Sequence, residues 1–308
     1  MKVLIAGCGY VGTLLGQELA KSGHEVWGLR RDFMALRELE KTGIRPIQAN
    51  LLSSESLTKL PSVDYVVMCQ APSKKNDDYN ATYYEGTKNL LAALPPAGGG
   101  SPPDSRRAGV SGGKGACRKL LFISSTSVYS TQDGSWVDES TDPLTGKHGD
   151  REATENAKTL LNAEAFVLSG PHPSMVLRLS GIYGEGRNRV KSILEGRIKP
   201  ALSDMYMNRI HVTDIVRAIR LLLEKGSPGE IYLGSDDSPC TQKEFYSWVF
   251  ERLSMAVPSA SDGEASHFHG QSNKRVSNKK IKEIGLKLRY PSFKEGYAPL
   301  IADIVSHA

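Results

Sequence analysis

The chain of 308 residues is 39% hydrophobic and 24% charged, and it carries a formal net charge of +5. This length and composition fit a globular protein with one large domain or two modest domains. No apolar run approaches the roughly 20 residues that a membrane helix needs, so the sequence predicts no membrane segment. The four cysteines lack C-x-x-C spacing and predict free thiols in a reducing compartment, with neither a metal site nor a disulfide framework.

The first predicted elements are a strand at residues 3–6 and a helix that begins near residue 10. Between them lies the motif G-C-G-Y-V-G. In such a turn the first glycine permits a tight bend, the second lets the backbone approach a pyrophosphate, and the third brings the helix against the strand. The helix N-terminus then faces the phosphates. The motif predicts a dinucleotide site whose contacts include Gly7, Gly9, Tyr10, Val11 and Gly12.

A second strand at residues 25–29 is followed by Arg30, Arg31 and Asp32. NAD sites usually place an acidic residue at the end of this strand, where it holds the ribose 2′-hydroxyl. Here two guanidinium groups stand at that place and can grip a 2′-phosphate, whereas Asp32 comes one step later, in the first turn of the next helix. The sequence predicts NADP(H) as the preferred cofactor and NAD(H) as the alternative. A solvated arginine pair that caps a loop is the other interpretation.

Strands and helices continue to alternate up to about residue 180. The expected strands lie at 64–68, 119–123 and 174–179, with helices at 83–94 and 153–169. This alternation predicts a parallel sheet with helices on both faces. We therefore expect an α/β fold with a Rossmann-type, doubly wound sheet, in a nucleotide-binding domain at residues 1–180.

One segment stands apart in composition. Residues 98–119 are rich in Gly, Ser and Pro and contain five basic residues against one acidic residue, so they hold four of the five net positive charges. Without apolar periodicity, this segment predicts a flexible surface insertion at 98–118. Because the positive charge is local, we expect no nucleic-acid partner, and a neutral spacer is favoured over a basic interaction arm.

After residue 180 the pattern loosens. A helix at 213–225, a short strand at 230–233 and a helix opened by the capping-box sequence T-Q-K-E at 241–244 predict a small, discontinuous C-terminal lobe. We place this substrate lobe at residues 181–308, with some elements returning to the first domain. A cleft between the lobes would hold the substrate over the carboxyl ends of the strands.

Three strings resemble a known family: S-S-T-S-V-Y at 124–129, L-R-L-S-G-I-Y-G-E-G-R at 177–187 and R-I-H-V-T-D at 209–214. They are similar to the extended short-chain dehydrogenase/reductases, the NAD-dependent epimerase/dehydratase group. Segments 273–278 and 290–296 look most like the atypical members of that group. The resemblance covers nearly the whole chain apart from the insertion and implies the same Rossmann-type fold.

The resemblance implies roles for residues that follow several strands. In the family a Ser or Thr three residues before the V-Y pair hydrogen-bonds the substrate oxygen; Ser125 holds that position, with Thr126 beside it. An Asn stands where the family usually has an Asp facing adenine, and its amide can still reach an adenine edge. Tyr129 and Tyr183 are either site residues or ordinary packing. The implied cofactor contacts are Asn50, Leu51, Gln70, Ala71, Pro72, Ser180 and Ile182.

The family's Tyr-x-x-x-Lys pair is missing. In the family, the lysine and the cofactor lower the pKa of the tyrosine, so that it exchanges a proton as hydride moves. One alignment places Thr154 and Lys158 at the two positions, and a second alignment, anchored on Glu164, places Asn156 and Leu160 there. Neither alignment supplies a phenol, and an aliphatic hydroxyl is too weakly acidic to replace one near neutral pH.

Two functions follow from these features. The first is an NADP(H)-dependent oxidoreductase or epimerase acting on a carbonyl or hydroxyl group of a small molecule. Ser125 and Thr126 would polarise the carbonyl, and Lys158 or a water would supply the proton. The second is a catalytically weak or inactive NADP(H)-binding sensor or partner-binding protein. The missing phenol favours the second function, whereas Ser125 and the full second lobe favour the first, which is our leading interpretation.

Several other polar residues have two interpretations. His211 is expected to be a packed hinge residue rather than a substrate contact. Asp214 is interpreted as a helix-start residue whose carboxylate accepts backbone N–H bonds. Three arginines either bind an anionic substrate or belong to a solvated face: Arg187, Arg189 and Arg209.

The family resemblance also implies a homodimer. The helices at 83–94 and 153–169 would pack on their symmetry mates as a four-helix bundle. The apolar residues offered for this contact, which could instead face the chain's own sheet, are Leu90, Leu91, Leu94, Leu160 and Leu161. The first strand starts at Lys2, which predicts no leader peptide and a cytoplasmic location. An organelle such as a plastid is the alternative if a transit peptide has been removed.

Overall fold

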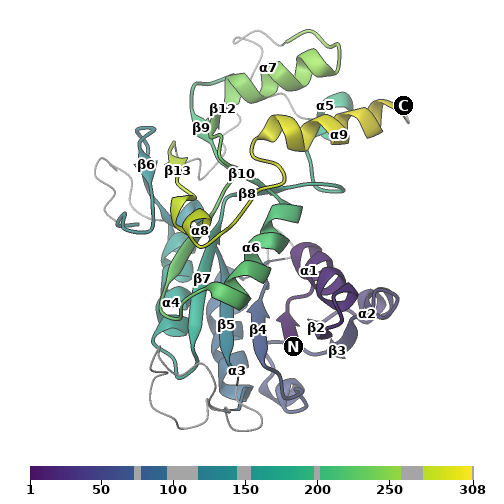
Figure 1. Cartoon of the computed structure of the whole chain (residues 1–308), viewed down its shortest axis with the longest axis vertical. Helices are drawn as coiled ribbons and strands as arrows, with labels where there is room; N and C mark the ends of the chain where they lie inside the picture. The colour runs from purple at the N-terminus through teal and green to yellow at the C-terminus, as the bar shows by residue number, and fades with distance from the viewer. Residues whose placement is uncertain (73–77, 96–116, 144–153, 198–201, 258–272, 307–308) are drawn as a thin grey trace. The chain divides into compact units, whose positions relative to one another are not determined.

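The computed structural model describes residues 1–72, 78–95, 117–143, 154–197, 202–257 and 273–306 (Figure 1). The chain forms two compact units. The first consists of Met1–Ser124, Glu155–Leu177 and Ile219–Ile231, and the second of Ser125–Thr154, Arg178–Ala218 and Tyr232–Ala308.

The described residues form a seven-stranded sheet, most of it in the first unit, with the order β11-β7-β5-β4-β1-β2-β3. The pairs β5–β4, β4–β1, β1–β2 and β2–β3 are all parallel. The strands are β1 (Lys2–Ala6), β2 (Glu25–Arg30), β3 (Arg45–Gln48), β4 (Tyr65–Met68), β5 (Lys119–Ser125), β7 (Ser174–Leu179) and β11 (Ile231–Gly234). The order reverses direction between β1 and β4, which makes this point the topological switch of a doubly wound sheet. The predicted α/β fold class is confirmed.

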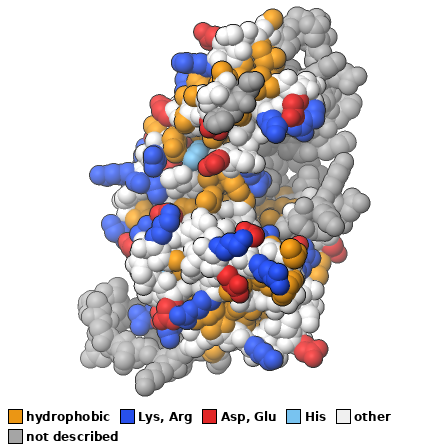
Figure 2. All heavy atoms as spheres, turned by 90° about the vertical axis from the view of Figure 1, so that its right-hand side faces the viewer, with side chains coloured by type: hydrophobic (Ala, Val, Ile, Leu, Met, Phe, Trp, Pro, Cys, Tyr) orange, Lys and Arg blue, Asp and Glu red, His pale blue; other side chains and the backbone are white. Residues whose placement is uncertain are grey.

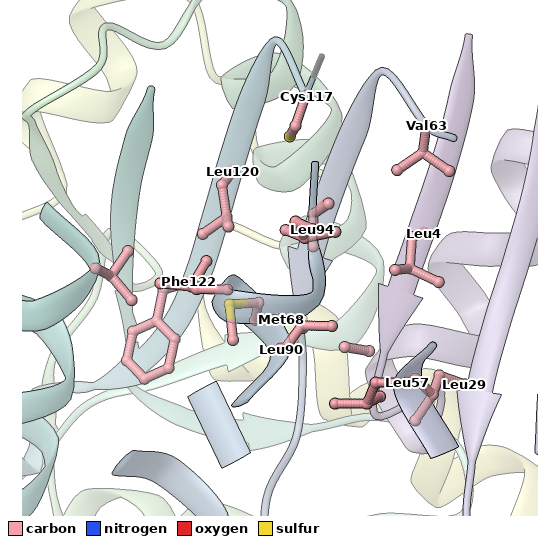
Figure 3. Close-up of a cluster of buried hydrophobic side chains, with 14 of the residues drawn as sticks. Leu4, Leu29, Leu57, Val63, Met68, Leu90, Leu94, Cys117, Leu120 and Phe122 are labelled. Carbon is pink, nitrogen blue, oxygen red and sulfur yellow. The ribbon is translucent and has the colours of Figure 1, made fainter. Parts of the chain in front are cut away.

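Helices cover both faces of this sheet. They are α1 (Tyr10–Lys21), α2 (Phe33–Glu40), η1 (Ser54–Leu57), η2 (Ala81–Glu85), α3 (Gly86–Ala93), α4 (Glu155–Leu168) and the second half of α6 (Val212–Lys225). Leu4 of β1 belongs to a buried cluster, drawn in Figure 3, that joins the sheet to Leu90 of α3 and Val167 of α4. Ile5 points to the opposite face, where a Cβ on Gly16 of α1 would approach its Cδ1 to 3.3 Å.

The second unit contains short paired strands within its described residues. Parallel pairs join β8 (Gly181–Tyr183) to β10 (Arg209–His211) and β6 (Trp136–Val137) to β13 (Arg275–Val276), and an antiparallel pair joins β9 (Tyr206–Met207) to β12 (Cys240–Thr241). Its helices are η3 (Thr126–Val128), α5 (Val190–Leu194), the first half of α6, α7 (Gln242–Arg252), α8 (Lys279–Glu283) and α9 (Phe293–Ser306). An apolar core joins α5, α7 and α9 through side chains that include Ile193, Phe245, Tyr246 and Tyr297.

The capping box predicted at 241–244 is confirmed. The Thr241 hydroxyl accepts a hydrogen bond from the Glu244 N–H at 3.1 Å, and the Glu244 carboxylate accepts one from the Thr241 N–H at 2.7 Å. These two bonds satisfy two backbone donors that α7 leaves free at its start, which explains why this sequence signal is dependable.

Three features differ from the sequence expectations. Strand β3 was not predicted, because it is only four residues long, contains Pro46 and lies at the edge of the sheet. Residues 125–154 were placed in the first domain but lie in the second unit, where β6 pairs with β13. The insertion 98–118 lies outside the described residues except for its end: Cys117 is buried and the Arg118 N–H donates to the Asp64 carbonyl at 2.7 Å, so this end is packed structure.

The leucines offered for a dimer are largely buried within the single chain. Leu90, Leu91, Leu94 and Leu160 are at most 7% exposed. They serve the chain's own core, so the homodimer stays a prediction that these side chains do not support. On the face shown in Figure 2, basic and acidic side chains are interspersed rather than gathered by sign. Within the described ranges we find no helix whose length and hydropathy would let it span a bilayer.

Candidate functional site

Two glycines of the turn after β1 are required by the fold. Gly7 has φ = +79°, and a Cβ at this position would lie 2.5 Å from the Gln70 backbone. A Cβ at Gly12 would lie 2.9 Å from Cγ2 of Ile5, so the missing side chain lets α1 pack on β1. Both glycines therefore hold the positions that the motif assigns to the tight bend and to the contact between helix and strand.

Gly9 has no such packing reason. Among the described residues, a Cβ there would meet only the Gly7 carbonyl oxygen, at 3.9 Å. Gly9 precedes Tyr10, the first residue of α1, and Val11 follows in the same helical turn. Backbone N–H groups and the helix dipole favour an anion at such a start. The open backbone fits the pyrophosphate of a dinucleotide.

The ends of four parallel strands meet at one edge of the first unit. Hydrogen bonds continue the ladder just past the strands, from Cys8 N–H to the Leu29 carbonyl (3.0 Å), from Ala49 N–H to the Arg30 carbonyl (3.1 Å) and from Cys69 N–H to the Ala6 carbonyl (2.7 Å). The residues that follow β1, β2, β3 and β4 therefore lie side by side at the carboxyl edge, where doubly wound sheets bind ligands. These are the positions of the predicted cofactor contacts in this unit.

The end of β2 presents two guanidinium groups. Arg30 is its half-buried last residue and Arg31 is exposed. The Cys8 N–H bond to the Leu29 carbonyl joins the glycine turn to the residue before Arg30. Burial raises the pKa of Cys8 to about 11, and the Thr13 hydrogen bond and the Arg30 charge oppose this rise. Asp32 is the N-cap of α2, where one carboxylate oxygen accepts the Met34 N–H at 2.8 Å. Asp32 therefore serves the helix start, as the sequence predicted.

Asn50 and Leu51 follow β3. The Asn50 side-chain oxygen accepts the Leu52 N–H at 3.1 Å, which leaves its amide nitrogen as the group that can donate to a ligand. The Leu51 carbonyl accepts a 2.9 Å hydrogen bond from the Asn89 side chain of α3. This bond ties the segment after β3 to the neighbouring helix.

Gln70 lies after β4 and is 7% exposed. Its amide nitrogen donates to the Thr87 hydroxyl at 3.0 Å, while its amide oxygen is buried without a partner in the described part of the chain. A buried acceptor without a donor is costly unless a ligand group supplies one. Ala71 is exposed and Pro72 is half-buried beside it. This orphaned oxygen is a second feature that fits a bound cofactor.

Ser125 and Thr126 begin the second unit. The Ser125 hydroxyl, half-buried, accepts the Ser127 N–H at 3.1 Å. A hydroxyl oxygen that accepts can still donate its own hydrogen, so Ser125 keeps a donor for a substrate oxygen. Thr126 is buried, and its hydroxyl makes a long 3.4 Å bond to the Leu179 carbonyl.

Ser180 and Ile182 also lie in the second unit. Ser180 is buried, its N–H donates to the Gly234 carbonyl at 2.9 Å, and its hydroxyl has no partner among the described residues. Ile182 is the half-buried middle residue of β8, in register with Ile210.

Helix α4 is anchored through Glu164. This buried carboxylate accepts a 2.5 Å hydrogen bond from the Ser124 hydroxyl in β5. Leu160, one turn earlier, is fully buried, whereas Lys158 is partly exposed and forms a 3.0 Å ion pair with Glu155. The second alignment, which places Asn156 and Leu160 at the family's Tyr and Lys positions, is anchored on this same Glu164.

The two tyrosines with open roles are packed. The buried Tyr129 hydroxyl donates to the Asp138 carbonyl and accepts from the Arg178 guanidinium, both at 2.8 Å. Tyr183 is buried and stacks on Tyr297 with ring centroids 4.7 Å apart. These contacts favour the packing interpretation for both.

His211 and Asp214 hold the C-terminal segment within the second unit. Burial lowers the pKa of His211 to about 4, so the ring is neutral near pH 7. The His211 ring packs on the Tyr290 ring, with the two ring centroids 4.1 Å apart. Asp214 is fully buried, and its carboxylate accepts the Arg289 and Tyr290 N–H groups at 2.6 and 2.9 Å. Asp214 accepts backbone bonds as expected, but from the loop before α9.

The three arginines do not form one solvated face. Arg209 is buried, with its guanidinium 3.7 Å from the Phe245 ring centroid, so the solvated interpretation is wrong for this residue. Arg189 donates to the Tyr246 hydroxyl at 2.5 Å, and Arg187 is exposed.

Two buried pairs of the first unit were missed by sequence reasoning: Gln70 with Thr87, and Ser124 with Glu164. Thr87 carries no signal, because only the fold brings it to Gln70. Glu164 carries one, since an acidic residue on the apolar face of a helix needs a buried partner.

Comparisons with known proteins show the family to which this fold belongs. The model of the NAD-dependent epimerase/dehydratase family matches residues 3–233. Protein YeeZ of Escherichia coli strain K12 is 25% identical over 302 residues, covering 94% of this chain and 96% of YeeZ. A structure from Methylobacillus flagellatus, described as an NAD-dependent epimerase/dehydratase, is 27% identical with a TM-score of 0.75 and covers 99% of this chain and 98% of that chain.

A more distant likeness shows the fold alone. DesIV, a dTDP-glucose 4,6-dehydratase from Streptomyces venezuelae solved as a double mutant with NAD and DAU bound, has a TM-score of 0.76 at 18% identity. The match covers 98% of this chain and 96% of that chain.

Proposed function

The chain belongs to the NAD-dependent epimerase/dehydratase family, and on this premise we propose that it is an NADP(H)-dependent oxidoreductase or epimerase for a carbonyl or hydroxyl group of a small molecule. The observation that carries the proposal is the open backbone at Gly9, between two glycines that the fold itself requires. The pyrophosphate of a dinucleotide can approach the backbone at this opening. The bound cofactor would supply or accept the hydride.

The preference for NADP(H) rests on Arg30 and Arg31. They stand at the end of β2, while the carboxylate of Asp32 caps α2. Charge-assisted hydrogen bonds contribute about 1.5–3 kcal/mol, so the double change Arg30→Ala, Arg31→Ala should remove about ten- to hundredfold of NADPH affinity relative to NADH. Arg37→Ala is the matched control, because this arginine of α2 stacks on the Phe33 ring at 5.2 Å. A preference that survives the double change would refute the assignment.

Ser125 is proposed to hold the substrate oxygen. The bond that its oxygen accepts from the Ser127 N–H orients the hydroxyl, and its hydrogen then donates to the oxygen on which negative charge develops. Thr126 is the second polar side chain at this position. Lys158 or a water is proposed to supply the proton.

Single-turnover oxidation of bound NADPH against a panel of carbonyl compounds tests the enzyme proposal. Ser125→Ala should slow the step by about 10² or more, as the loss of one oxyanion donor does, with unchanged NADPH affinity. Ser127→Ala is the matched control, since only the backbone of this exposed residue contacts Ser125. A large loss of the single-turnover rate in Lys158→Met supports the alignment that pairs Thr154 with Lys158. An unchanged rate supports the alignment anchored on Glu164.

The sensor function is the second candidate. It is favoured by the buried Leu160 on the α4 helix that Glu164 anchors, because an apolar side chain there cannot assist a proton transfer. If wild type and the Ser125→Ala and Lys158→Met variants all bind NADPH normally and no carbonyl compound is turned over, the enzyme proposal fails and the sensor function stands.

A further inference from the structure

Two phenol rings of the first unit contact each other at a tilt and pack against the sheet. Tyr79 and Tyr83 are four residues apart, both half-buried, with ring centroids 4.6 Å apart. The Tyr83 ring meets the Phe122 ring of β5 edge to face at 6.4 Å. A side-chain hydrogen bond with Tyr83 also acts to lower the pKa of Tyr79. The pair is therefore fixed both to itself and to the central sheet.

The start of this helix lies at the carboxyl edge of the sheet. Strands β4 and β5 are parallel neighbours, so a helix that connects them must run back from the end of β4. Asp78 caps the start, where its carboxylate accepts the Ala81 N–H at 3.1 Å. Tyr79 follows directly, in the first turn of the helix that runs back from the edge where β4 ends. A phenol thus stands at the edge where the ligand is expected.

The helix is distorted where it carries Tyr83. Residues Ala81–Glu85 form a π-helical turn before α3 begins at Gly86. Such turns carry an extra residue and occur frequently at functional sites. This turn packs against α4, and Tyr84 meets Phe166 of α4 at 5.8 Å. The phenol pair therefore lies on an element that packs against α4.

We propose that Tyr79, in place of Lys158 or a water, gives its proton directly to the carbonyl oxygen, and that Tyr83 positions Tyr79 and relays a proton to it. The inference rests on the proposed function. A carbonyl that accepts a hydride at carbon moves its π electrons onto oxygen, and that oxygen takes the hydroxyl proton of Tyr79. The Tyr79 phenolate takes a proton from Tyr83, and Tyr83 regains a proton from the solvent, so that one hydride and one solvent proton are consumed in each reduction. The carbonyl compound is reduced, and the reduced cofactor that gives the hydride is oxidised.

We expect the charge of the bound cofactor to have the largest influence on the pKa of Tyr79. Burial raises its pKa, and the hydrogen bond from Tyr83 opposes that rise. The charged groups of the packed elements are Asp78, the ion pairs of Glu85 with Lys88 at 3.7 Å and of Glu155 with Lys158 at 3.0 Å, the buried Glu164 of α4, and Lys119 of β5. The Glu164 carboxylate accepts the Ser124 hydroxyl, and the Lys119 ammonium donates to the Glu224 carbonyl. The β5 contact is the apolar Phe122 ring. A positive charge brought close to the phenol therefore favours its ionised form.

The first test follows phenolate absorbance in the whole protein during pH titrations with saturating NADP⁺ or saturating NADPH. The oxidised nicotinamide is positively charged, so one phenol should titrate about one pH unit lower with NADP⁺ than with NADPH. Tyr79→Phe should abolish this difference, and Tyr83→Phe should raise the lower value. Tyr84→Phe is the matched control and should keep the difference. A difference that persists in Tyr79→Phe, or none in wild type, overturns the inference.

The second test separates this inference from the proposed function. With any carbonyl compound that wild type reduces, Tyr79→Phe should slow the single turnover by about 10² or more, while Tyr84→Phe keeps the wild-type rate. Wild-type turnover with an unaffected Tyr79→Phe variant refutes the role of Tyr79 and leaves the proposed function standing. If wild type reduces no carbonyl compound, the proposed function fails and the phenolate titration alone decides whether Tyr79 faces the cofactor. Unchanged thermal unfolding shows that each variant is folded.

Discussion

Among single residues, Gly9 and Gly12 lack a side chain for different reasons. We expect Gly9 to leave room for a ligand, whereas Gly12 lets α1 pack on β1. A Cβ at Gly12 would crowd Ile5, so Gly12→Ala should lower the free energy of unfolding by about 1–3 kcal/mol, the usual cost of overpacking. Gly9→Ala should cost only about 0.5–1 kcal/mol, because Ala is a poorer N-cap than Gly, but it should weaken NADPH binding at least about tenfold. Urea unfolding and calorimetry measure the two effects. Normal NADPH binding by Gly9→Ala would contradict the assignment.

Asp236 makes the stability of the second unit depend on pH. Burial raises its pKa to about 8 from the ordinary 3.8, and its carboxylate accepts one hydrogen bond, from the Ser238 N–H at 3.2 Å. Between these pH values the folded chain holds a proton that the unfolded chain has lost, so the free energy of unfolding falls as the pH rises. His211 has the opposite effect between about 4 and 6.5, where only the unfolded chain gains a proton.

The clearest window therefore runs from pH 6.5 to pH 8. Wild type should lose up to about 1.4 kcal/mol of unfolding free energy per pH unit there, and Asp236→Asn should show a flatter profile. Burial also lowers the pKa of Lys274 to about 8, which adds stability only at higher pH, up to the ordinary value of 10.5. Urea unfolding at several pH values measures the slope. A wild type that becomes more stable across the window contradicts the burial of an ionisable carboxyl.

At the scale of elements, α9 packs on β8 through a glycine. A Cβ at Gly296 would overlap the Tyr183 hydroxyl and lie 2.7 Å from two of its ring carbons. Gly296→Ala should therefore cost about 1–3 kcal/mol. Tyr183→Phe alone should be nearly neutral, since the hydroxyl has no partner among the described residues, and it should restore part of the loss in the double variant. Additive effects in thermal unfolding would show that the two residues do not meet.

The sequence predicted elements best where local chemistry decides them. Apolar runs and the T-Q-K-E capping box placed most strands and helix α7 within a few residues, because strand burial and helix capping act over short distances. Strand β3 was missed because an edge strand needs no strong apolar pattern. The partners of Gln70 and Glu164 could not be predicted, since each lies on another element and only the fold brings the pair together.

At the scale of the whole molecule, the composition of the insertion predicts that it can be removed. The composition of segment 98–116 offers few core residues, and loop-closure entropy changes only slowly with loop length. Deleting 98–116 should change the free energy of unfolding by less than about 1 kcal/mol. Extending the deletion through Cys117 and Arg118 should cost more, because these residues are packed. A shorter deletion that prevents folding would contradict the prediction.

The central claim is that the carboxyl edge of β1 and β2 holds an NADP(H) cofactor. Calorimetric titration of the whole protein with NADPH and with NADH tests it most directly, since it needs neither a substrate nor turnover. We expect one saturable site for each nucleotide, with NADPH bound more tightly because Arg30 and Arg31 meet its 2′-phosphate. Binding of neither nucleotide would contradict the cofactor site itself, and equal affinities would contradict the role of the two arginines.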